Sequence, residues 1–132
     1  MLLILSIGIT NVNVYYELKH FCLQYPNWKK AYNNIENYRN GIVSFERIAQ
    51  TNLINKPVEK CVEAQWLFYE RIKMVEKAAE ETDKILSNYI LKAVTEGISY
   101  DHLKASLGIP CCKDVYYDLY RRFFWLLSEA RK

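Results

Sequence analysis

The chain has 132 residues, of which 51% are hydrophobic and 25% are charged, and its net charge is +3. This length allows one compact domain or two small helical lobes, and this composition excludes a largely disordered chain. Only four glycines and three prolines are present, which argues against a turn-rich β-sandwich or β-barrel. The mild basicity permits a polyanionic partner without requiring one.

The chain begins with the apolar run MLLILSIGI. This run resembles the apolar core of a signal peptide, but it has neither a positively charged start nor a small-residue cleavage site. It is also about half as long as the ~20 residues that a membrane span needs. We therefore predict a docked N-terminal strand or helical extension, a cytoplasmic location and no membrane partner.

A first helix is predicted from Tyr15 onward, because apolar side chains recur there at helical spacing: Leu18, Phe21, Cys22 and Tyr25. Pro26 is expected to end it, and Asn27 to cap a second helix that runs from Trp28 to about Tyr38. The segment 39–56 has a glycine, several asparagines and no clear period. It is predicted to be a linker with a brief strand at GIVSFERI.

A long helix is predicted to begin at Pro57, since proline suits the first turn of a helix. Residues at alternating three- and four-residue steps form what we call the seam: Val58, Cys61, Gln65, Phe68, Ile72, Val75 and Ala79. Such a stripe packs lengthwise against another helix. The partner is either a helix of the same chain or the helix 57–80 of a second subunit, which would make a homodimer.

The next helix is predicted to start after a cap at Thr82 and to end at Gly97, a left-handed cap. Its predicted apolar face comprises Ile85, Leu86, Tyr89, Ile90, Ala93 and Val94. The predicted fold is thus all-α, with an N-terminal helical hairpin, a long central helix and a C-terminal helix-turn-helix. The hairpin and linker occupy residues 1–56 and the remainder 57–132, together forming one compact domain.

Ser99 is expected to cap a short helix over residues 100–107, which ends at Gly108 and is followed by a long helix after Pro110. This order is typical of a helix-turn-helix unit. Its turn is predicted to bury Leu103, Leu107 and Ile109. Seven positions separate Gly108 from Val115, the first inward residue expected in the long helix, which is one more than the commonest spacing. The turn is therefore longer by a residue, or Pro110 begins a distorted first turn.

Two faces of the last helix are predicted. The inward face comprises Val115, Leu119, Phe123 and Leu127, with Tyr116, Tyr120 and Phe124 beside them. The outward face comprises Lys113, Tyr117 and Arg121, flanked by Asp114, Asp118 and Arg122. Guanidinium and phenol groups can contact phosphates and base edges in a major groove of double-stranded DNA.

The candidate DNA-contacting residues are therefore Lys113, Tyr117, Asp118, Arg121, Arg122 and Lys104. The two aspartates of the last helix would be repelled by phosphate unless they face cytosine amines or a basic protein surface. The alternative is that these charges form only the solvated face of a terminal helix.

Neither catalysis nor metal binding is expected. The sequence has four cysteines but no C-x-x-C motif: Cys22, Cys61, Cys111 and Cys112. Its two histidines provide no metal-ligand spacing beyond the single His20-x-Cys22. No Gly-rich phosphate loop, G-x-S-x-G, HExxH or apolar pair of carboxylates is present. We expect the thiols to be reduced in the cytosol, and we expect the protein to have no cofactor and no enzymatic activity.

Several stretches carry a resemblance to a known family: LKHFCLQYPNWKKAYNNI, KPVEKCVEAQ, YILKAVTEGISYDHLKASLGIP and YYDLYRRFFWLLSEARK. Together they look like RinA/ArpU-type phage regulators, found in prophages and mobile elements of low-GC Gram-positive bacteria. The C-terminal unit is also similar to region four of sigma factors, which docks promoter DNA and RNA polymerase. The resemblance implies a transcriptional regulator that activates late or packaging genes by binding DNA upstream of them.

Two other roles agree with the same pattern. A small-terminase-like packaging protein also joins a helix-turn-helix to an oligomerising helical hairpin, and it would form a large ring. A protein-binding module could instead use the aromatic helix to hold RNA polymerase. The mass in solution separates the ring from a monomeric or dimeric regulator.

Overall fold

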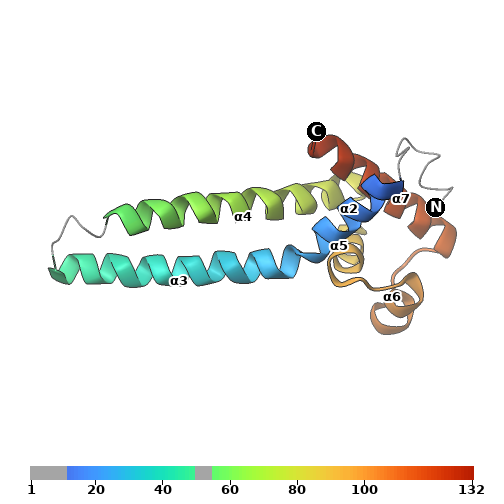
Figure 1. Ribbon diagram of the computed structural model, residues 1–132. Helices are drawn as coiled ribbons and strands as arrows, with labels where there is room; N and C mark the ends of the chain where they lie inside the picture. Colours follow the sequence, from blue (N-terminus) through green and yellow to red (C-terminus); the bar gives the residue numbers. More distant parts are fainter. Residues whose placement is uncertain (1–11, 50–54) are drawn as a thin grey trace. The chain divides into compact units, whose positions relative to one another are not determined.

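The computed structural model describes residues 12–49 and 55–132, with side chains described for 12–41 and 59–132. Every regular element within these ranges is a helix, which confirms the all-α prediction (Figure 1). The helices are α2 (Val12–Leu23), α3 (Tyr25–Ala49), α4 (Asn55–Thr82), α5 (Ser87–Glu96), α6 (Tyr100–Leu107) and α7 (Lys113–Ala130). The strand or helical extension predicted for the first nine residues lies outside the described ranges.

The chain divides into two compact units. Unit 1 combines Met1–Tyr25 with Lys73–Lys132, and unit 2 is Pro26–Ile72. The divisions fall after Tyr25, within α3, and after Ile72, within α4. They differ from the predicted boundary after residue 56.

Unit 2 is a helical hairpin in which α3 and α4 run antiparallel side by side (Figure 1). Here the sequence-based boundaries were wrong. The second helix begins at Tyr25, with Pro26 inside its first turn, and continues to Ala49. The predicted linker and brief strand after Tyr38 are therefore largely helical. Arg39 of α3 donates a hydrogen bond to Gln65 of α4 at the start of this segment, and tertiary contacts can override the weak helix propensity of asparagine and glycine.

The seam faces the interior in both units, as predicted. Gln65 in unit 2 is only 5% exposed, and Cys61 and Phe68 are partly buried. In unit 1, Val75 and Ala79 are buried as well. The side chain of Val58 lies outside the described side chains.

The amide of Gln65 joins α4 to α3 within the same chain. Its nitrogen donates to Glu36 Oε2 at 2.5 Å and to the carbonyl oxygen of Tyr32 at 3.4 Å. Its oxygen accepts a hydrogen bond from Arg39. A buried amide with its partners in place fixes the register of two helices. In unit 2 the seam is thus used by the chain's own α3.

Unit 1 packs α2, α5, α6 and α7 with the end of α4. Contacts join α2 to α5 and α7, and α5 to α6 and α7. The core is formed by apolar side chains from all five helices and the turn after α6, including Cys22, Val75, Ile90, Leu103, Ile109, Phe123, Phe124 and Leu127. At the end of α7, the Arg131 guanidinium lies 3.5 Å from Glu17 Oε1 and 4.0 Å from the Phe21 ring centroid, both on α2.

The corner between α4 and α5 differs from the prediction. Thr82 is the last residue of α4, and its hydroxyl donates to the carbonyl oxygen of Ala78 at 2.7 Å. The carboxylate of Asp83 instead accepts from the amides of Ile85 and Leu86, at 2.8 and 2.9 Å. This tight turn leaves Ile85 83% exposed rather than on the apolar face. An aspartate after a helix is a strong turn former, because its side chain mimics a backbone acceptor.

Candidate nucleic-acid interface

Helix α6 has the predicted bounds, whereas α7 begins at Lys113, two residues later than the predicted start directly after Pro110. The Ser99 hydroxyl accepts from the amide of His102 at 3.2 Å, which caps α6. Gly97 and Gly108 close α5 and α6 with φ angles of 69° and 62°. Glycine adopts this left-handed conformation without the steric cost that a Cβ brings. In Figure 1, α6 is seen close to end-on while α7 runs across the view, so the two axes cross steeply.

The turn occupies residues 108–112, because α7 begins at Lys113 with Cys112 at its N-cap. It is therefore the longer of the two expected forms, and Pro110 lies within it. Ile109 is fully buried and anchors the turn to the core. Lys104 Nζ donates to the carbonyl oxygen of Ile109 at 3.3 Å.

The turn is also held by an aromatic side chain at the start of α6. The Tyr100 hydroxyl donates to the carbonyl oxygen of Cys111 at 2.7 Å, and its ring lies 5.3 Å from that of Tyr116 on α7. Burial and the neighbouring Cys112 raise the pKa of the Cys111 thiol. These contacts fix where α7 starts, and hence which of its residues face outward.

The inward face of α7 is rotated from the predicted one. Phe123, Phe124 and Leu127 are fully buried and Tyr116 is 2% exposed, whereas Val115 is 44% exposed. Val115 was therefore placed wrongly. The predicted inward face was a stripe of residues spaced four apart. In the structure, the turn before α7 orients the helix so that the centre of its buried face lies nearer Tyr116 and Tyr120. Leu107, 41% exposed, was also wrongly assigned to the core of the turn.

Most of the predicted DNA-contacting side chains lie at the surface. Lys104, Lys113, Tyr117, Asp118 and Arg122 are all exposed. Tyr117 is 38% exposed, with its ring against those of Tyr116 and Tyr120. These residues lie on the N-terminal half of α7 or on α6.

Arg121 is the exception. Its side chain is only 12% exposed, and its guanidinium donates to the carboxylate of Asp118 one turn earlier. A paired and largely covered guanidinium contacts a base only after leaving its carboxylate. An Asp–Arg pair three residues apart on a helix signals this pairing in the sequence.

The outermost line of α7 comprises Asp114, Asp118, Arg122 and Trp125, at four- and three-residue steps. The indole of Trp125 is 39% exposed and was missed among the candidate residues. The sequence could have indicated this position, because Trp125 lies on the opposite side of a helix from Tyr116 and Phe123, which were predicted to face the core. This line carries two carboxylates, one guanidinium and one aromatic ring.

Within residues 12–49 and 55–132, no three or more His, Cys, Asp or Glu side chains gather as a metal site would require. In those ranges no helix combines the length and apolar character needed to cross a bilayer. The chain matches no family model, no curated protein and no solved structure.

Proposed function

We propose that this protein is a cytoplasmic, sequence-specific DNA-binding regulator of transcription from a prophage or mobile element, and that it activates late or packaging genes. The observation that carries the proposal is the unit of α6, a glycine-bearing turn and α7, with the N-terminal half of α7 exposed. A short helix, a turn and a second helix at a steep angle can place the second helix in a major groove.

The exposed polar groups suit contact with a duplex. Lys113 and Arg122 supply cations for phosphate oxygens, and Arg122 can also donate to both acceptors of a guanine. The Tyr117 phenol lies between them on the same helix. On α6, Lys104 is exposed, and its ammonium also donates to the carbonyl oxygen of Ile109 in the turn. It would therefore support DNA binding both by contacting phosphate and by keeping the turn in place.

The source and the sign of regulation rest on the resemblance to RinA/ArpU-type regulators. The four stretches that carry it contain the first three seam residues, most of α5, all of α6 and most of α7. That family activates transcription from phage genomes, and the proposal extends the same role to this chain.

A second candidate function is favoured by the outermost line of α7. Asp114, Asp118 and Trp125 would suit a basic protein surface better than a phosphate backbone, since carboxylates repel phosphate. A module that holds RNA polymerase would use this line, either with DNA binding or instead of it. Charge reversal of the two aspartates distinguishes the candidates, because it would strengthen DNA binding and abolish a polymerase contact.

We also propose a homodimer through helix 57–80, but its contact surface is not the seam. Between residues 59 and 72 the seam faces α3 of the same chain. The exposed apolar side chains of this part of α4 are Val62, Trp66, Leu67 and Tyr69. Of these, Val62, Trp66 and Tyr69 lie on one side of the helix, and the Tyr69 ring also lies 6.4 Å from that of Tyr32 on α3. The exposed part of this stripe, centred on Trp66, is the proposed contact with a second subunit.

The experiment is an electrophoretic mobility shift assay of the full chain with DNA fragments from around its gene, repeated across a salt series. The proposal predicts a shift that weakens with rising salt and stays stronger for one fragment than for the others. Equal shifts for all fragments would leave only non-specific attraction, and no shift at low salt would contradict DNA binding.

A further inference from the structure

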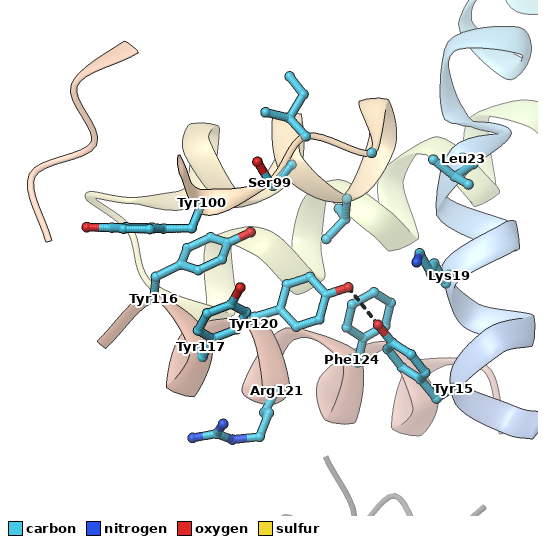
Figure 2. A pocket seen from close by; sticks show the side chains of 14 residues that line it. Tyr15, Lys19, Leu23, Ser99, Tyr100, Tyr116, Tyr117, Tyr120, Arg121 and Phe124 are labelled. Atoms are coloured by element: carbon cyan, nitrogen blue, oxygen red, sulfur yellow. Dashed lines mark hydrogen bonds between the residues drawn. The ribbon is translucent and has the colours of Figure 1, made fainter. Parts of the chain in front are cut away.

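A pocket of about 450 Å³ lies within unit 1, between α2, the end of α5, the start of α6 and α7 (Figure 2). Its volume falls within the range of roughly 300–1,000 Å³ that small-molecule sites occupy. All its lining residues belong to this one unit. A small-molecule site of this kind is independent of whether the protein binds DNA.

The charge of the lining is positive only. Lys19 on α2 and Arg121 on α7 line the pocket, and no aspartate or glutamate does. Arg121 is paired with Asp118. Lys19, by contrast, has no ion-pair partner among the side chains that the structure describes, and it is partly buried. A partly desolvated ammonium without a carboxylate is a good partner for an anion.

Phenol groups face the same space. Figure 2 shows Lys19 on one side of the pocket and Tyr116 and Tyr117 on the other. Within the described residues, neither of these two hydroxyls is hydrogen-bonded to another side chain or to the backbone, whereas those of Tyr15 and Tyr120 bond each other at 2.8 Å. Burial raises the pKa of Tyr116, so its phenol is neutral at physiological pH and can donate.

The remaining walls are apolar. Leu23, Val94, Ile98 and Phe124 line the pocket together with the tyrosine rings. Edge-to-face contacts already order these rings, for example Tyr120 and Phe124 with centroids 4.8 Å apart. A preformed aromatic wall accepts a flat hydrophobic body at low entropic cost.

We propose that this pocket binds a small organic anion with a carboxylate group and a flat ring system. The carboxylate lies beside the Lys19 ammonium, the ring lies against the apolar wall, and the free phenols on the opposite side face polar substituents at the far end of the ring system. The absence of acidic lining residues selects against cations of the same shape.

The test uses three probes with one ring system: naphthoate, the neutral naphthalenemethanol and the cationic naphthylmethylamine. Each is titrated into the full chain by isothermal calorimetry, and the methyl resonances of Leu23, Val94 and Ile98 are followed by NMR. We expect naphthoate to bind saturably at one site, with an affinity about tenfold higher than that of the neutral probe. A difference of this size corresponds to one charge-assisted hydrogen bond. The methyl shifts should be confined to the pocket.

Substitutions assign the charge selectivity. Lys19→Gln should reduce naphthoate affinity to that of the neutral probe, and Lys19→Arg should retain the preference. Lys84→Gln, an exposed lysine of the same unit outside the pocket, should change nothing. Circular dichroism checks that each variant is folded.

Three results would overturn the proposal. They are no saturable binding of naphthoate at millimolar concentration, equal or tighter binding of the cationic probe, and an unchanged preference in the folded Lys19→Gln variant.

Discussion

The hydroxyl oxygens of Tyr15 on α2 and Tyr120 on α7 lie 2.8 Å apart, and this hydrogen bond joins two helices that are distant in the sequence. The Tyr15 ring also packs edge-on against Phe124, with centroids 5.2 Å apart. Burial and this bond together raise the pKa of Tyr120, so its phenol is neutral. The first described helix thereby fixes the position of the helix proposed to contact DNA.

Replacing Tyr15 with phenylalanine removes the hydrogen bond and keeps the ring. The partly buried Tyr120 hydroxyl then loses its partner, so the free energy of unfolding should fall by ~0.5–1.5 kcal/mol. Urea denaturation measures the change. Tyr16→Phe, at an exposed neighbouring position, serves as the control, and an equal loss in both variants would argue against the bond.

The rotated phase of α7 is tested by a pair of alanine substitutions. Phe123→Ala removes a fully buried ring and should cost ~3–5 kcal/mol. Val115→Ala changes a side chain that is 44% exposed and should cost no more than ~0.5–1 kcal/mol. The same denaturation measurement compares them, and a large loss at Val115 would restore the phase predicted from four-residue spacing.

Cys22 is fully buried on α2, and burial raises its thiol pKa from 9.0 to about 12. The folded state therefore holds this proton more tightly than the unfolded state. The resulting stability is fully present below about pH 9 and is lost as the pH rises towards 12. We expect the free energy of unfolding to fall from about pH 9 to about pH 9.5, where most tyrosines are still protonated, and to fall less steeply in Cys22→Ala.

Alkylation checks the same site by another route. At neutral pH the exposed Cys112 should react rapidly with iodoacetamide, and Cys22 only after unfolding. Peptide mass spectrometry of a short labelling pulse identifies the modified thiols. Rapid labelling of Cys22 in the folded protein would contradict its burial.

The proposed dimer surface gives a fourth prediction. Trp66 is 56% exposed and stacks on Tyr69 with centroids 5.5 Å apart. Trp66→Glu should shift a dimer to a monomer in sedimentation velocity, because it places a charge in the middle of the apolar stripe. Lys60→Glu introduces the same carboxylate at an exposed position on another side of α4, with a larger change in net charge, and should leave the dimer intact. A wild-type monomer, or a dimeric Trp66→Glu variant, counts against this interface.

Local chemistry made the end of α5 and both ends of α6 predictable. The left-handed φ at Gly97 and Gly108 and the Ser99 cap depend on single residues and their immediate neighbours. The length of α3 was not predictable in the same way. Its second half contains asparagine and glycine, and it stays helical beside α4, where Arg39 and Gln65 form a hydrogen bond between the two helices.

The candidate site was predictable only in part. The sequence indicated which helix carries the polar face, and Lys113, Tyr117 and Arg122 are exposed as expected. The outward direction depends on how the turn is anchored at Ile109, which is a tertiary effect, so Val115 was misjudged. The pocket beside Lys19 could not be predicted, because helices from both ends of the chain form it.

The central claim is that the exposed N-terminal half of α7 contacts DNA. Fluorescence anisotropy with the preferred fragment across a salt series tests it, using wild type, Lys113→Gln, Arg122→Gln and, as the control, Lys84→Gln. We predict that Arg122→Gln weakens binding by ~1–3 kcal/mol with an unchanged melting temperature. Lys113→Gln should lower the slope of log affinity against log salt by ~1, and Lys84→Gln should behave as wild type. Wild-type affinity and salt slope in both α7 variants would contradict the account.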